Sequence, residues 1–181
     1  MKRHAVFLDR DGVINRSRIV EGKPVPPASP DELELLPGVP EAAALLHAAG
    51  YLLIVVTNQP DVARGTAARH TVEEMNRHLL KTLPLASVRT CFHDDADFCS
   101  CRKPKPGLLL TAAVDFNLDL SGCYMVGDRW RDMEAGRRAG CRTIFIDYNY
   151  SEPRPELFDY SGGSLLTAAR FILAESAGFT A

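Results

Sequence analysis

The stretch AVFLDRDGVIN, residues 5–15, decides the fold that this sequence predicts. It begins with an apolar run that ends at Asp9, and a second carboxylate, Asp11, comes just before Gly12. A short apolar run that stops at a charge and a glycine is typical of a buried parallel strand. Ligands bind at the carboxyl ends of such strands in open α/β sheets, so we expect both acids at a binding site.

The two acids also have the spacing that phosphoryl chemistry requires. Alternate residues of an extended strand project to the same side, so Asp9 and Asp11 are expected to point the same way before Gly12 lets the chain turn. Their mutual repulsion favours a cation between them. One carboxylate can attack phosphorus, while the other protonates the leaving oxygen and then deprotonates water. The alternative is that DRDG forms only an acidic turn after a strand.

Length and composition favour one compact domain over residues 1–181. The chain has 181 residues, of which 46% are hydrophobic. Its formal net charge of −2 argues against nucleic acid or a membrane surface as a partner, and we expect a monomer. No apolar run approaches the ~20 residues of a membrane span, and the run after the basic start is too short for a signal peptide. We therefore expect a cytoplasmic protein.

Apolar segments are expected to alternate between strands and helices. Further strands are predicted at 52–56, 88–92, 124–128 and 142–146, and helices at 37–51, 71–83, 106–117, 131–141 and 165–173. This order predicts a Rossmann-like three-layer α/β/α sandwich with a mainly parallel sheet. The proline-rich segment at about 13–30 is expected to form a flap over the site, and 148–160 a loop of unassigned role.

Several details of the helices are also predicted. A capping box is expected to start the second helix, formed by Thr71 and Glu74. The residues expected to face the core are Leu45 and Leu46 in the first helix, Met75, Leu79 and Leu83 in the second, and Leu109, Leu110 and Val114 in the third.

The expected strand ends bring further polar groups to the same edge of the sheet. Thr57, Asn58 and Gln59 follow the second strand, where a hydroxyl and amides are neutral donors. Asp128 ends the fourth strand and is placed to complete the ligand set of a cation. Asp132 follows on the next helix.

Three thiols and an imidazole form a possible metal site in a loop, residues 91–101: Cys91, His93, Cys99 and Cys101. This set suits a closed tetrahedral zinc site, and the odd total of five cysteines favours thiolate ligands over a disulfide framework. The alternative is free thiols beside a chance histidine. Arg102 and Lys103 follow at once, so a structural zinc would fix where two phosphate-binding cations point.

Taken together, these segments resemble the haloacid dehalogenase superfamily. FLDRDGVIN is similar to its first motif, VVTNQ to its second, Lys103-Pro104 to its third and VGDRWRD to its fourth, over about residues 4–146. The resemblance implies a minimal cap, Mg²⁺, and phosphoric monoester hydrolysis through an aspartyl phosphate. Within the superfamily the sequence most resembles the heptose 1,7-bisphosphate 7-phosphatases, whose Ala-Arg-Gly loop it matches at 63–65, and next the histidinol-phosphatase domains. Both carry a similar zinc loop.

The resemblance also implies roles for individual residues. Asp9 would be the nucleophile and Asp11 the acid/base, with Thr57 and Lys103 steadying the phosphoryl group. Asp9, Asp128 and the backbone carbonyl of Asp11 would hold Mg²⁺. The zinc ligands would be Cys91, His93, Cys99 and Cys101, and the substrate would be bound by Asn58, Gln59, Arg64, Arg102 and Arg129, with Asp132 as a further site residue.

The implied substrate is a small phosphorylated sugar, the 7-phosphate of D-glycero-D-manno-heptose 1,7-bisphosphate, on the route to lipopolysaccharide precursors. One alternative is a phosphatase for histidinol phosphate or another small metabolite. A more distant alternative is a zinc-stabilised binding module without catalysis, against which the intact acids at 9, 11 and 128 speak.

Overall fold

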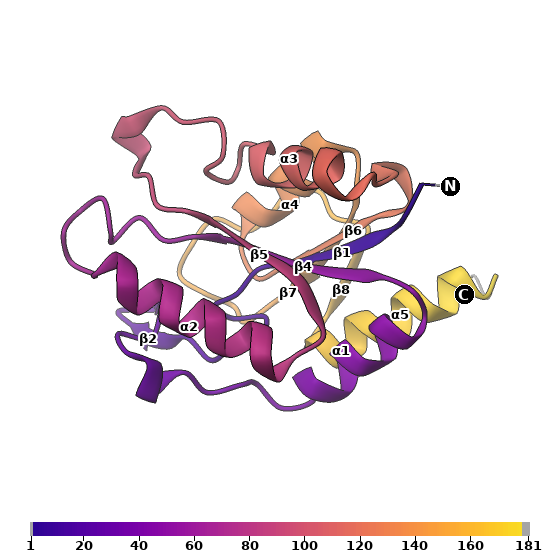
Figure 1. Cartoon of the computed structure of the whole chain (residues 1–181), viewed down its shortest axis with the longest axis horizontal. Coiled ribbons are helices and arrows are strands. Elements are labelled where there is room, and N and C mark those ends of the chain that lie inside the picture. The colour runs from indigo at the N-terminus through magenta and orange to yellow at the C-terminus, as the bar shows by residue number, and fades with distance from the viewer. Residues whose placement is uncertain (1, 179–181) are drawn as a thin grey trace.

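The computed structural model describes residues 2–178 and shows one six-stranded sheet with helices on both faces (Figure 1). The strands are β1 (Ala5–Leu8), β4 (Leu52–Asn58), β5 (Leu85–Cys91), β6 (Tyr124–Gly127), β7 (Arg142–Ile146) and β8 (Tyr160–Gly162). Their order is β5-β4-β1-β6-β7-β8, and all neighbouring pairs are parallel. The predicted α/β sandwich is therefore confirmed.

In the described part of the chain, five α-helices cover the sheet. One face carries α1 (Val39–Ala48), α2 (Arg69–Thr82) and α5 (Leu165–Ser176), and the other carries α3 (Gly107–Phe116) and α4 (Trp130–Ala139) (Figure 1). Short 3-10 turns occur at Pro30–Glu32, Asp95–Asp97 and Leu120–Gly122. Within residues 2–178 we find no helix with the length and apolar character needed to cross a bilayer.

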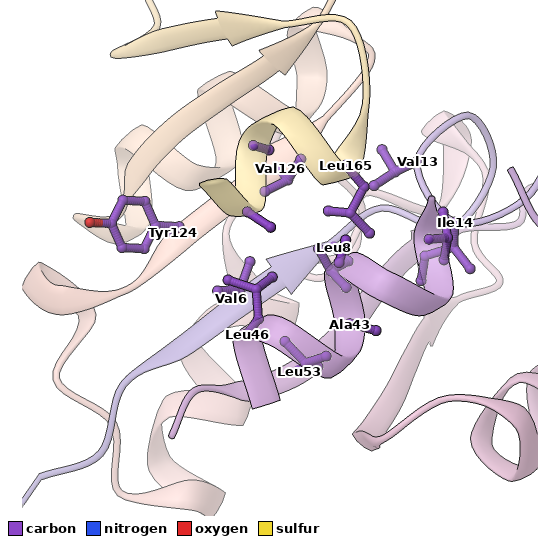
Figure 2. Packing of buried hydrophobic residues seen from close by; sticks show 14 of the residues in the cluster. Val6, Leu8, Val13, Ile14, Ala43, Leu46, Leu53, Tyr124, Val126 and Leu165 are labelled. Atoms are coloured by element: carbon purple, nitrogen blue, oxygen red, sulfur yellow. The ribbon is translucent and has the colours of Figure 1, made fainter. Parts of the chain in front are cut away.

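Strand β1 lies at the centre of the sheet, paired with β4 on one side and β6 on the other. Its side chains alternate between two cores. Val6 and Leu8 pack with Leu46 and Leu165 on one face (Figure 2), while Phe7 belongs to the core under α3 and α4. A parallel strand buried on both faces must be apolar throughout, which explains the run that precedes Asp9.

Two of the predicted helix faces are partly wrong. Leu46 is buried, but Leu45 is 38% exposed. In α3 the buried leucines are Leu108 and Leu109, whereas Leu110 is 42% and Val114 81% exposed. Both helices are apolar on more than one side, so periodicity alone does not select the face that meets the sheet.

The predicted start of α2 is also wrong. The helix begins at Arg69, and its N-cap residue is Ala68, which makes no side-chain cap hydrogen bond. Thr71 consequently lies inside the first turn and forms no capping box. The predicted inward face holds, because Met75, Leu79 and Leu83 are all buried.

The proline-rich segment contains more structure than predicted. Val13 and Ile14 are buried in the core, and an antiparallel hairpin follows, formed by β2 (Arg18–Val20) and β3 (Lys23–Val25). The edge strand β8 was not predicted, because three residues, none of them fully buried, are too short to show a pattern.

Candidate active site

The carboxyl ends of the central strands open into a cavity of about 300 Å³. Asp9 and Asp11 line it after β1, and Thr57 and Asn58 line it at the end of β4. The remaining walls come from the hairpin at 23–26, the loop at 60–64, Lys103, Arg129, Arg131, Asp132 and Glu152. The sheet thus brings together residues that are more than a hundred positions apart in sequence.

A buried ion-pair cluster connects the strand ends. Lys103 Nζ lies 2.8 Å from Asp9 Oδ1 and 2.6 Å from Asp132 Oδ1, and it donates a third hydrogen bond to the Val56 carbonyl at 2.8 Å. Burial alone would lower the pKa of Lys103, but Asp132 and Asp9 outweigh that effect and raise it. Burial raises the pKa of Asp9 to about 6, although Lys103 partly opposes the shift.

Three carboxylates of the cluster fit a divalent cation. One oxygen from each of Asp9, Asp128 and Asp132 lies within 4.8 Å of the others. Asp128 is buried, and its Oδ1 atom has no hydrogen-bond partner among residues 2–178. Burial, followed by the charges of Asp9 and Asp132, raises the pKa of Asp128 well above its usual value. A hard oxygen-binding cation such as Mg²⁺ would satisfy that orphaned atom and neutralise the cluster.

The glycine after the two acids is required by this arrangement. Gly12 has φ +89°, and a Cβ atom at this position would lie 1.9 Å from Asp128 Oδ2. Any other side chain would push Asp128 out of the cluster.

Asp11 is held apart from the cluster by its own set of donors. Arg10 is fully buried and donates from Nε and Nη2 to the Asp11 carboxylate, with Nη2 at 3.1 Å. Asn15 and Gln59 donate to it at 2.9 and 2.7 Å. Arg10 was not predicted, although an arginine inside D-R-D on a buried strand end is itself a signal, because a buried guanidinium needs an anionic partner.

The polar residues after β4 mainly support their neighbours. Gln59 bridges Asp11 and Thr57 Oγ1 and does not line the cavity. Asn58 lines the cavity, and its amide also binds the Lys103 backbone: Nδ2 donates to the Lys103 carbonyl, and Oδ1 accepts from the Lys103 backbone N–H. Asn58 therefore fixes the loop that carries Lys103.

The predicted arginines are divided between two places. Arg64 lines the cavity and pairs with Asp94, and Arg129 lines it and pairs with Glu152 at 2.8 Å from Nε. Arg102 differs from the expectation, because its guanidinium turns away to Asp95 at 2.8 Å and does not line the cavity. Lys23 and Arg131 line the cavity but were not predicted.

The four predicted zinc ligands converge. Each of Cys91, His93, Cys99 and Cys101 offers one ligand atom within 4.8 Å of the others. The three sulfur–sulfur distances are 3.2, 3.5 and 3.7 Å, close to the about 3.8 Å expected between thiolates around a tetrahedral zinc. The donor types and their spacing therefore fit zinc.

Comparison with known proteins places the chain in a family. The family described as HAD-hydrolase-like matches residues 100–161. D-glycero-beta-D-manno-heptose-1,7-bisphosphate 7-phosphatase of Pseudomonas aeruginosa is 36% identical over 151 residues, which cover 81% of this chain and 82% of that protein. The Campylobacter jejuni enzyme named for the alpha anomer is 34% identical and covers 81% and 83%. The chain belongs to the heptose-bisphosphate phosphatase family of the haloacid dehalogenase superfamily.

A solved structure of this family matches over nearly the whole chain. It is D,D-heptose 1,7-bisphosphate phosphatase from B. bronchiseptica in complex with magnesium and phosphate, with a TM-score of 0.80 and 30% identity. The match covers 96% of this chain and 99% of that one.

The haloacid dehalogenase arrangement can perform a two-step displacement. Asp9 reaches the cavity with a carboxylate oxygen, and Asp11 lies two residues further on with its own donors. When bound, Mg²⁺ would supply charge stabilisation to the phosphoryl oxygens. Lys103 adds a positive charge that is stabilised and held in position by its ion pairs with two carboxylates.

Proposed function

We propose that this protein is an Mg²⁺-dependent phosphatase that removes the 7-phosphate of D-glycero-D-manno-heptose 1,7-bisphosphate. The observation that carries the proposal is the buried cluster of Asp9, Lys103, Asp128 and Asp132 beside a cavity of about 300 Å³. The names of the relatives point to the same substrate.

In the first step, an Asp9 oxygen forms a bond to phosphorus while the bond from phosphorus to the sugar oxygen breaks. Asp11 gives its proton to the departing sugar oxygen. In the second step, water attacks the aspartyl phosphate, Asp11 takes a proton from that water, and the bond between Asp9 and phosphorus breaks to release phosphate. Thr57 and Lys103 are proposed to steady the phosphoryl group in both steps.

The basic residues around the cavity support an anionic substrate. Lys23, Arg64, Arg129 and Arg131 all line it, from three different segments of the chain. Guanidinium groups suit bidentate contacts with phosphate oxygens. We propose Arg64 and Arg129 as substrate-binding residues, with Asn58 and Gln59 acting through Lys103 and Asp11.

Further parts of the proposal concern the rest of the molecule. We propose one phosphatase domain over residues 1–181, with a flap at about 13–30 and a structural zinc in the loop at 91–101. The continuous sheet and the convergence of the three thiols with His93 support these points. We also propose that the enzyme acts as a monomer in the cytoplasm.

Substitution of the nucleophile tests the proposal. Phosphate release is measured with Mg²⁺ for the wild type, Asp9→Asn and the exposed-site control Asp31→Asn. The substrates are both anomers of the heptose bisphosphate, fructose 1,6-bisphosphate and histidinol phosphate. We expect the highest kcat/KM on a heptose bisphosphate, no turnover for Asp9→Asn and normal turnover for Asp31→Asn. Turnover that survives in Asp9→Asn overturns the mechanism, and a preference for histidinol phosphate overturns the substrate.

A further inference from the structure

The segment that follows β7 reaches the site at three points. The hydroxyl of Tyr150 donates to Asp128 Oδ2 at 2.9 Å. The backbone N–H of Ser151 donates to the carbonyl of Gly22, in the turn of the β2–β3 hairpin, at 2.9 Å. Glu152 accepts from Arg129 Nε at 2.8 Å. This segment therefore joins a carboxylate of the cation cluster to the flap and to the cavity wall.

Asp128 has few other supports. Tyr150 occupies Oδ2, while Oδ1 is buried without a hydrogen-bond partner in the described part of the chain. Lys103 contacts Asp9 and Asp132 but forms no ion pair with Asp128. The orientation of the Asp128 carboxylate in the cluster thus depends on one phenolic donor.

The tyrosine is itself held by its local sequence. Tyr148 and Tyr150 stack with ring centroids 5.6 Å apart and an angle of 30° between the rings. Asn149 between them has φ 59°, a left-handed conformation that asparagine tolerates, and its N–H donates to Asp147 at 2.8 Å. This turn places both rings on one side.

The hairpin of the flap contacts the segment after β7 directly. Gly22 has φ +74°, and a Cβ atom there would lie 2.5 Å from Ser151 Oγ, so glycine suits this close approach of the hairpin turn to Ser151. The hairpin also supplies cavity residues from 23 to 26. The support of Asp128 and the position of the flap are therefore linked through two adjacent residues.

We propose that Tyr150 is a positioning residue that orients Asp128 for the cation. The inference rests on the proposed role of Asp128 as a metal ligand. Groups that hydrogen-bond to a metal ligand orient it, and their loss typically weakens metal affinity by about 10- to 100-fold. The phenolic proton stays on Tyr150 throughout and only donates a hydrogen bond.

The test is a titration with Mn²⁺ alone of the protein whose 91–101 loop is loaded with zinc. Electron paramagnetic resonance monitors the Mn²⁺ that binds, so no turnover is needed. Tyr150→Phe keeps the stacked ring but loses the donor, and we expect about 10- to 100-fold weaker Mn²⁺ binding. Tyr148→Phe is the matched control, because Tyr148 shares the stacking but not the hydrogen bond to Asp128, and we expect wild-type affinity. Asp128→Asn identifies the site, since its loss of binding assigns the signal to this cluster.

Kinetics separate positioning from a direct catalytic role. With the heptose bisphosphate as substrate, we expect Tyr150→Phe to need more Mg²⁺ for half-maximal rate, with kcat restored at saturating Mg²⁺. Equal Mn²⁺ affinity in the two tyrosine variants overturns the inference. That outcome leaves the phosphatase proposal intact, whereas turnover in Asp9→Asn overturns the proposed Asp9 mechanism and not the metal-binding result.

A second measurement covers the case in which Tyr150→Phe does not fold. In a crystal structure of the wild-type protein with Mn²⁺, we expect the Tyr150 hydroxyl to remain within hydrogen-bond distance of Asp128. A metal-bound structure in which Tyr150 has left Asp128 overturns the inference.

Discussion

Replacing Lys103 with methionine tests the charge balance of the active site. The lysine side chain is 2% exposed and contacts Asp9 and Asp132 at 2.8 and 2.6 Å. Methionine has a similar length but no charge, so the variant leaves the carboxylates of Asp9, Asp128 and Asp132 together without a cation. Removing one partner of a buried ion pair typically costs about 3–5 kcal/mol.

We therefore expect the free energy of unfolding of the metal-free variant to fall by about 3–5 kcal/mol. The melting temperature should fall by about 6–20 °C, given about 2–4 °C per kcal/mol for a chain of this size. The loss of stability should be at the lower end of both ranges at acidic pH. The raised pKa values of Asp9 and Asp128 let these carboxylates take up protons there, which relieves their mutual repulsion.

Urea unfolding followed by circular dichroism, with a chelator present, measures the effect. Lys81→Met is the control, because Lys81 is exposed in the last turn of α2 and its loss should change stability by at most about 0.5 kcal/mol. Added Mg²⁺ should recover part of the stability of Lys103→Met but not its turnover. Equal urea midpoints for the two methionine variants would refute the argument that Lys103 balances the cluster.

Two further predictions concern pH and zinc. Burial raises the pKa of Asp9 to about 6 in the folded metal-free protein, whereas the same group in the unfolded chain releases its proton near pH ~4. Between these two values the folded protein binds more protons than the unfolded chain, so its free energy of unfolding falls as the pH rises. Stabilisation by Mg²⁺ should grow over the same window in thermal melts, and Asp9→Asn should lose the part of this dependence that Asp9 contributes, while Asp128 keeps its own. A flat Mg²⁺ effect in the wild type would contradict the assigned site. Cys99→Ser should lose zinc by metal analysis, lower the melting temperature and reduce turnover, because Lys103 lies just after the zinc loop. Full turnover in a zinc-free variant would show that the loop does not position Lys103.

The central strands could be predicted because their physical requirements are visible locally. A strand buried on both faces must be apolar throughout, and β1, β4, β6 and β7 show such runs. The carboxyl ends of parallel strands lie at the same edge of a sheet, so the side chains just after them are close together. This rule predicted that Asp9 and Asp128 lie at one site.

Other features depend on packing that no local pattern reports. The direction of Arg102 is set by Asp95, seven residues earlier in a loop, so its charge alone suggested the cavity. Val114 is apolar and at helical spacing, yet it is exposed because α3 meets the sheet through Leu108 and Leu109. The contact between Tyr150 and Asp128 joins a loop without periodicity to a strand end, which only the folded chain brings together.

The three acids with proposed roles in the reaction or in cation binding are supported by different side chains. Asp9 is paired with Lys103, Asp11 with Arg10, and Asp128 with Tyr150. Asp9 shares Lys103 with Asp132, and the nearby charge of Asp132 adds to the burial that raises the pKa of Asp9. In the proposed mechanism, Asp9 attacks phosphorus, Asp11 acts as acid and base, and Asp128 holds the cation. The three supports come from the turn just after β1, from the loop after the thiol cluster and from the segment after β7, so the proposed chemistry depends on distant parts of the chain being folded together.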